Sequence, residues 1–307
     1  MKFYLAPMEG ITGYIYRNSY NKFFYNIDKY FAPFIVANKS HRMKTKELKD
    51  IQPENNKGIN LVPQILTKDA EDFIITAQRL MQLGYKEINL NLGCPAGTVV
   101  SKGRGSGFLA KREELDRFLE QIYNMDDIEI SIKTRIGKDS PDEFYELIKI
   151  YNKYPVKELI IHPRIQKDFY GNKPNLDVFK DALSSSTSKV VYNGDIFTAD
   201  DYKSITDTFP KVDTVMLGRG IIANPGLINS IKNNTVLDKK VLRDFHDEIF
   251  NNYIEVYNEE KNAIFKMKEL WGYMINNFSD NKKYAKKIKK AQKLRDYNEA
   301  ISGLFEE

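Results

Sequence analysis

Short apolar runs that alternate with segments of helical spacing fill about the first 230 of the 307 residues in this chain. Repeated units of this kind are typical of βα folds with a parallel sheet. The predicted strands lie at residues 2–6, 30–36, 60–66, 87–92, 129–134, 158–162, 189–193 and 214–217. Eight units predict a (β/α)8 TIM barrel rather than an open doubly wound sheet, whose first turn normally carries Gly-x-Gly-x-x-Gly. The first turn here, Ala6-Pro7-Met8-Glu9-Gly10, lacks that fingerprint.

From about Val236 the strand-like runs cease and helical spacing continues to the end. We therefore predict a barrel domain at residues 1–235 and a small helical domain at residues 236–307. Residues 261–295 contain eleven basic and two acidic side chains, an excess larger than the net charge of +5 of the whole chain. Such a stretch is either a solvated surface or a binding site for RNA or DNA, because concentrated lysines bind phosphates through counterion release.

Cysteine and histidine are scarce in this chain. Cys94 is the only cysteine, which excludes an intramolecular disulfide and fits a reducing compartment. The three histidines are too scattered to build a metal centre, so we expect no metal. No apolar stretch approaches the roughly 18 to 20 residues of a membrane-spanning helix, and the apolar N-terminal run stops at Glu9. We expect a cytoplasmic monomer without a membrane segment.

Polar side chains and glycines follow seven of the eight predicted strands. The C-terminal ends of parallel barrel strands meet at one mouth, so these groups are expected to converge there. Asn193-Gly194-Asp195 and Gly218-Arg219-Gly220 follow the last two strands, where barrels commonly bind phosphate, and they predict a phosphate-bearing ligand. Lys133 and His162 can reach polar atoms of a planar heterocycle. Gln64 can hydrogen-bond to the edge of that heterocycle as both donor and acceptor. Each group alone also has an ordinary structural explanation.

Cys94 follows the fourth predicted strand, and the segment after it carries Lys102, Arg104 and four glycines. An isolated cysteine is usually a small buried hydrophobic residue. This segment, however, is polar and rich in glycine, so we expect a flexible, unburied, cationic lid that places the thiol against a ligand. The thiol can act as a nucleophile or as a proton donor, and no histidine nearby in the sequence decides between the two.

Seven motifs, taken in order, resemble the signature set of the tRNA-dihydrouridine synthases. They are Leu5-Ala6-Pro7-Met8-Glu9-Gly10-Ile11-Thr12, Pro63-Gln64-Ile65, Asn91-Leu92-Gly93-Cys94-Pro95, Ile132-Lys133-Thr134-Arg135-Ile136-Gly137, His162-Pro163-Arg164, Asn193-Gly194-Asp195-Ile196 and Met216-Leu217-Gly218-Arg219-Gly220. The resemblance covers residues 4–227, and the helical tail resembles the C-terminal RNA-binding domain of that family. The element around Cys94 is the most specific, because other flavin barrels do not usually carry a cysteine in that setting.

The resemblance implies an enzyme in which NADPH reduces FMN and the reduced flavin passes a hydride to C6 of a uracil in tRNA. By analogy Cys94 gives the proton to C5. By position, the residues implied to hold FMN are Ala6, Pro7, Met8, Gln64, Lys133, His162, Asn193, Gly194, Asp195, Gly218 and Arg219. Those implied to hold the uracil or its phosphate are Asn91, Arg135, Arg164 and Tyr170, with Lys102 and Arg104 on the lid. The tail lysines expected to contact RNA are Lys282, Lys283, Lys286, Lys287 and Lys290.

Three positions depart from the pattern of the family. Gly13 replaces the usual aspartate after Thr12, Ala32-Pro33-Phe34 lacks an acidic residue that is frequent in the family, and Leu176 stands where the family commonly has a tryptophan. Two other functions stay open: a flavin barrel with a small substrate, as in dihydroorotate dehydrogenases or ene-reductases, and an RNA-binding protein with a vestigial barrel. The basic tail weighs against the first, and the polar strand ends weigh against the second.

Overall fold

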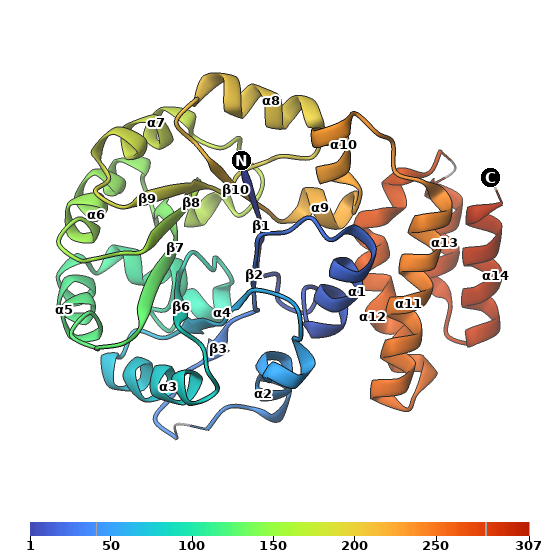
Figure 1. Cartoon of the computed structure of the whole chain (residues 1–307), viewed down its shortest axis with the longest axis horizontal. Helices are drawn as coiled ribbons and strands as arrows, with labels where there is room; N and C mark the ends of the chain where they lie inside the picture. Colours follow the sequence, from blue (N-terminus) through green and yellow to red (C-terminus); the bar gives the residue numbers. More distant parts are fainter. Residues whose placement is uncertain (41, 280, 307) are drawn as a thin grey trace.

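The computed structural model describes residues 1–40, 42–279 and 281–306. Its strands form one parallel sheet that curls into a barrel, with helices α3 and α5 to α8 around the outside (Figure 1). The strands are β1 (Lys2–Leu5), β2 (Lys29–Phe31), β3 (Ile35–Val36), β4 (Leu61–Val62), β5 (Gln64–Leu66), β6 (Glu87–Leu92), β7 (Glu129–Gly137), β8 (Glu158–Ile165), β9 (Lys189–Tyr192) and β10 (Thr214–Leu217).

Two of the eight predicted strands are interrupted, which is why ten short strands appear. Ala32-Pro33-Phe34 separates β2 from β3, and Pro63 separates β4 from β5. Proline has no backbone N–H to donate to a sheet ladder, so each strand breaks there. Because β2 pairs with β4 and β3 pairs with β5, the sheet order β3-β5-β6-β7-β8-β9-β10-β1-β2-β4 returns to its starting strand. The eight-stranded TIM barrel is therefore confirmed.

Amphipathic helices cover the outside of the barrel. In α5, for example, Leu115, Phe118, Leu119 and Ile122 form one buried stripe at helical spacing. The helices are α1 (Tyr14–Phe24), α2 (Thr45–Ile51), α3 (Ala70–Gln82), α4 (Gly97–Val100), α5 (Arg112–Ile122), α6 (Phe144–Tyr151), α7 (Leu176–Ser185), α8 (Ala199–Thr208), α9 (Arg219–Ala223) and α10 (Leu227–Asn233), with 3-10 turns η1 (Pro53–Asn55), η2 (Gly105–Ala110), η3 (Pro141–Glu143), η4 (Gln166–Asp168) and η5 (Ile275–Asn277).

The barrel interior combines an apolar layer with an ion cluster at the N-terminal ends of the strands. Tyr4, Phe31 and other buried side chains fill the layer. Below it, the Lys29 ammonium lies 2.9 Å from a Glu87 oxygen and 2.8 Å from a Glu158 oxygen. The buried cation is thus paired on two sides, and the barrel is filled at the end opposite the mouth.

No strand follows residue 235 in the described part of the chain, which contains α11 (Lys239–Tyr257), α12 (Glu260–Met274), α13 (Asn281–Lys290) and α14 (Leu294–Phe305), with the turn η5 between α12 and α13. They lie together beside the barrel (Figure 1). The Phe245 ring of α11 packs edge-on against Tyr16 and Phe24 of α1, with ring centroids 5.7 and 5.3 Å apart. Aromatic pairs of this geometry contribute beyond their buried area, so α1 anchors the helical region. None of the described helices is long and apolar enough to cross a membrane.

Candidate active site at the barrel mouth

One pocket at the mouth gathers most of the residues that the sequence predicted for ligand binding. Its predicted lining residues are Ala6, Pro7, Met8, Lys133, His162, Tyr170, Asn193, Gly194, Asp195, Gly218 and Arg219. They come from the ends of β1, β7, β8, β9 and β10, which a parallel barrel brings to one rim. Phe197 also lines the pocket, with its ring centroid 5.4 Å from the Arg219 guanidinium. Nothing in the sequence indicates a role for Phe197 beyond its position two residues after Asp195.

The pocket is strongly cationic. The guanidiniums of Arg164 and Arg219 share the single carboxylate of Asp195, at 3.0 and 2.5 Å from its Oδ1 atom. Burial, with the charges of Arg135 and Lys133 beside it, holds the pKa of His162 well below its ordinary value. The imidazole is therefore neutral at pH 7. The excess of positive charge favours a ligand that carries negative charge at this end of the pocket.

Lys133 is the clearest sign that a ligand belongs in this pocket. Its ammonium makes no hydrogen bond or ion pair with any residue that the structure describes. Burial, with Arg135 nearby, lowers the pKa of Lys133 to about 7. Lys133 is half-buried in the pocket wall, so its amine has lost part of its hydration without gaining a protein partner, and it fits a ligand that supplies an acceptor atom. A flavin phosphate and ring system would meet such donors, and the residues present fit that group.

A chain of side-chain amides fixes the position of Cys94. The Asn91 Oδ1 atom accepts hydrogen bonds from the backbone N–H groups of Gly93 and Cys94, at 3.1 and 2.9 Å. The Asn91 Nδ2 atom donates to Gln64 Oε1 at 2.7 Å, and Gln64 Nε2 donates to Asn89 Oδ1 at 2.7 Å. Because each amide is both donor and acceptor, these bonds determine the orientation of all three. Gln64 and Asn91 thus lie beneath the Cys94 loop.

Arg135 is almost fully buried, and its guanidinium is committed within the protein. It donates to the backbone carbonyls of Gly93, Ile165 and Phe169 at 3.0, 2.7 and 2.6 Å. These bonds tie the loop that carries Cys94 to the loop that carries Tyr170. Arg164 is equally buried and binds Asp195 and the carbonyl of Asn172. Both arginines, predicted to hold the substrate, therefore fix the surrounding loops in this structure.

The Cys94 thiol is partly exposed and uncharged at neutral pH. Burial raises the pKa of Cys94, and this effect exceeds the opposite influence of Lys133 and Arg135. A protonated thiol can give up a proton, whereas a nucleophile must be a thiolate. The environment therefore favours proton donation, the alternative that the sequence left open.

The predicted flexible, unburied lid after Cys94 is wrong for its second half. Residues 105–109 are buried, and the Ser106 hydroxyl donates to the Cys94 carbonyl at 2.8 Å. Gly105 has a φ of +55°, and a Cβ atom there would lie 2.8 Å from the Cys94 carbonyl oxygen. The glycine allows close packing beneath the thiol, which its sequence position alone did not distinguish from flexibility. Lys102 is exposed and Arg104 is half-buried.

Aromatic rings border the open side of the pocket. Tyr170 is 52% exposed, and its ring centroid lies 4.4 Å from the Arg219 guanidinium. Phe169, also exposed, precedes it on the same loop. Exposed rings over a cationic pocket can stack on a planar base.

Lysines dominate the exposed faces of α13. Tyr284 and Ile288 are buried against the other helices, while the tail lysines predicted to contact RNA, Lys282, Lys283, Lys286, Lys287 and Lys290, are all exposed. A second group of exposed cations, Lys39, Arg42 and Lys44, lies between β3 and α2 on the mouth side and was not predicted from the sequence. Among the described residues, no group of three or more His, Cys, Asp or Glu side chains could hold a metal ion.

The fold and the pocket define a class of protein: a TIM-barrel enzyme whose cationic mouth suits an anionic, planar ligand and lies near a protonated cysteine. Solved barrels with the same fold include morphinone reductase in complex with tetrahydroNAD (TM-score 0.55, 13% identity, 77% of this chain and 88% of that one). Another is the old yellow enzyme homologue of Zymomonas mobilis (TM-score 0.54, 11% identity, 80% and 92%). At these identities the likeness concerns the fold.

The sequence profile of the family described as dihydrouridine synthase (Dus) matches residues 4–307. The chain is 28% identical over 311 residues to the probable tRNA-dihydrouridine synthase of Staphylococcus aureus strain MRSA252, covering 95% of this chain and 87% of the relative. It is 27% identical over 251 residues to tRNA-dihydrouridine synthase B of Pasteurella multocida strain Pm70, covering 81% and 74%. The chain belongs to the dihydrouridine synthase family. The predicted family and enzyme class are confirmed, and with them a flavin cofactor reduced by NAD(P)H.

Proposed function

We propose that this protein is a tRNA-dihydrouridine synthase that uses FMN, reduced by NADPH, to convert a uridine of tRNA into 5,6-dihydrouridine. The observation that carries this proposal is that the partnerless Lys133 lies with the Arg219–Asp195 pair in the mouth pocket, and near enough to Cys94 for its charge to act on the thiol, in a barrel that belongs to this family. When bound, FMN supplies the hydride for C6 of the uracil ring.

The residues of the pocket divide into those that bind FMN and those that position them. Lys133 and neutral His162 offer N–H groups to the flavin ring, and Arg219 offers its guanidinium to the phosphate. The other proposed contacts with FMN are Ala6, Pro7, Met8, Asn193, Gly194 and Gly218, which line the same pocket, and Gln64 beneath it. Arg164 keeps Asp195 and the neutral His162 ring in place.

Cys94 is the proposed proton donor to C5 of the uracil. Its raised pKa keeps the thiol protonated, and Asn91 and Ser106 hold the backbone on either side of it. Tyr170 is proposed to stack on the uracil. Arg135 connects the Tyr170 loop to the Cys94 loop, which keeps the bound uracil aligned with the Cys94 thiol. A uracil must leave its stack to reach this mouth, and a matched polar and aromatic pocket offsets the cost of unstacking.

The helical region at residues 236–307 is proposed as the tRNA-binding domain, and residues 1–235 as the catalytic domain. The exposed lysines of α13 provide the positive surface, and Lys102, Arg104 and the rim cations Lys39, Arg42 and Lys44 add charge around the mouth. We also propose that the enzyme is cytoplasmic and monomeric.

The experiment that tests the proposal is nucleoside mass spectrometry on unmodified tRNA after incubation with the protein, FMN and NADPH. Dihydrouridine is expected only when all components are present. Ribosomal RNA, free uridine and a small enone serve as competing substrates in parallel. Oxidation of reduced flavin by the enone or by free uridine, with none by tRNA, would contradict the proposal and favour a small-molecule reductase.

A further inference from the structure

Loop 1, residues 6–13, carries three of the proposed FMN contacts, Ala6, Pro7 and Met8, yet it contains no strand or helix. Its shape depends on hydrogen bonds to Thr12. The backbone N–H of Met8 donates to Thr12 Oγ1 at 2.8 Å, and the N–H of Thr12 donates to the Met8 carbonyl at 3.0 Å. The Thr12 carbonyl in turn accepts from Arg17 Nη1 at 2.7 Å. The residues that hold Arg17 in place therefore also stabilise loop 1, which carries the proposed FMN contacts.

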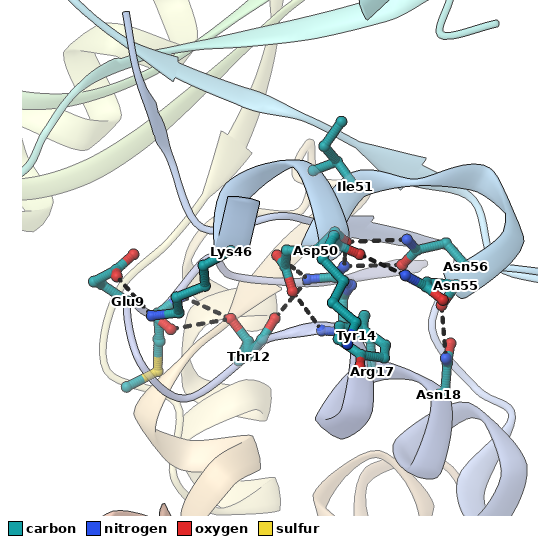
Figure 2. A network of polar contacts seen from close by, with 12 residues as sticks. Glu9, Thr12, Tyr14, Arg17, Asn18, Lys46, Asp50, Ile51, Asn55 and Asn56 are labelled. Carbon is teal, nitrogen blue, oxygen red and sulfur yellow. Dashed lines mark hydrogen bonds and ion pairs between the residues drawn. The ribbon is translucent and has the colours of Figure 1, made fainter. Parts of the chain in front are cut away.

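Arg17 is fully buried and paired with one carboxylate, that of Asp50 on α2 (Figure 2). Its Nη1 atom lies 3.1 Å from Asp50 Oδ2, and its Nη2 atom donates to the Asp50 carbonyl at 2.6 Å and to Asn56 Oδ1 at 2.8 Å. A buried guanidinium needs a compensating negative charge. Among the described contacts, only Asp50 supplies one.

Asp50 also performs a second task, because it caps helix α1. The N-cap residue Gly13 has no side chain, although this position normally prefers Asp, Asn, Ser or Thr. Asp50 Oδ1 accepts from the backbone N–H of Tyr14 at 2.6 Å, so the capping oxygen comes from a distant segment (Figure 2). A Cβ atom on Gly13 would lie 3.2 Å from that same Oδ1 atom. The carboxylate of Asp50 thus occupies the place where an N-cap side chain at residue 13 would sit.

We infer that Asp50 is a positioning residue for FMN binding, and that residues 13 and 50 are alternative sources of one carboxylate. In this chain α2 supplies it, and the absence of a side chain at Gly13 leaves room for it. Asp50 keeps Arg17 charge-paired, Arg17 holds Thr12, and Thr12 holds Met8 at the pocket. The inference rests on the proposed function, because it takes FMN as the ligand of loop 1.

A cycle of variants tests the inference: Asp50→Ala, Asp50→Asn, Gly13→Asp and the double variant Gly13→Asp/Asp50→Ala. FMN affinity is measured by fluorescence titration of the apoprotein, and Tm is measured beside it. Asp50→Ala is expected to weaken FMN binding about tenfold or more, the effect of one lost charge-assisted hydrogen bond. Asp50→Asn keeps the oxygen that caps Tyr14 but lacks the charge, so a smaller loss is expected. Gly13→Asp alone also weakens binding, because it places two carboxylates together.

The double variant decides the matter, because it restores one carboxylate in the same place. FMN affinity within about threefold of wild type supports the inference. A double variant no better than Asp50→Ala would overturn it, as would Asp50→Ala with lowered Tm and unchanged FMN affinity, which marks Asp50 as purely structural. If wild type itself bound no FMN, the proposed function would fail, and this outcome is read from the wild-type titration alone.

Discussion

Lys133→Met is expected to make the apoprotein more stable and the flavin complex weaker. The substitution keeps the length of the side chain and removes a half-buried ammonium that has no partner among the described residues. In the folded protein burial lowers the pKa of this amine from 10.5 to about 7. The unfolded chain therefore holds the proton more tightly than the folded chain, and this difference destabilises the fold.

The size and the sign of the effect follow from that pKa. Below pH 7 the ammonium is charged in both states, and the full cost, on the order of 5 kcal/mol, is present. Between pH 7 and 10.5 the folded protein has lost the proton while the unfolded chain retains it, so the stability of wild type rises with pH. The stability gained by Lys133→Met should therefore be largest at pH 6 and about half as large at pH 9.

Urea unfolding of the apoproteins at pH 6 and pH 9 measures this gain, and FMN titration measures the loss of affinity. Lys57→Met, at an exposed lysine on the opposite end of the barrel, is the control and should change the unfolding free energy by less than about 0.5 kcal/mol. A Lys133→Met protein no more stable than wild type at pH 6, or one with unchanged FMN affinity, would refute the reasoning.

Three further predictions concern the thiol, the phosphate end of the pocket and the tail. Cys94→Ala should retain FMN and lose about 10²- to 10⁴-fold in dihydrouridine formation, measured by nucleoside mass spectrometry, because a general acid is removed; full turnover would exclude Cys94 as the proton donor. Arg219→Met should weaken FMN more than riboflavin, which lacks the phosphate, and equal losses in parallel titrations would contradict a phosphate contact. Replacing Lys286, Lys287 and Lys290 with Gln should reduce the slope of log K against log salt for tRNA by about 2 to 3, whereas Lys57, Lys86 and Lys211→Gln, at exposed positions on the far end of the barrel, should leave it unchanged. Equal slopes for the two triple variants would indicate that the lysines of α13 form a solvated surface that does not contact tRNA.

The sequence was sufficient to predict the barrel and the contents of its mouth. Strand ends converge in any parallel barrel, so groups such as Lys133 and Arg219 could be placed together without coordinates. The interruptions at Pro33 and Pro63 follow from the same local chemistry.

What the sequence could not predict depends on contacts between distant segments. Asp50 lies 33 positions after Arg17, and nothing near either residue indicates that they pair. Arg135 and Arg164 follow polar strand ends like any ligand-binding residue, and only the observed carbonyl and carboxylate partners indicate that they fix loops. A glycine-rich segment has the same composition whether it is mobile or tightly packed. The tight packing around Gly105 depends on the residues that surround it, which the local sequence does not reveal.

The packing of Phe245 against α1 limits where segments of this protein can be exchanged with those of a relative. Exchanging residues 236–307 for the tail of a relative is an obvious route to a new RNA preference. The aromatic face of α1, with Tyr16, Tyr20 and Phe24, would then meet a foreign helix. A working chimera therefore has to take α1 and the tail from the same relative. The choice of exchanged segments depends on the aromatic contact between α1 and α11, and not only on the domain boundary near residue 235.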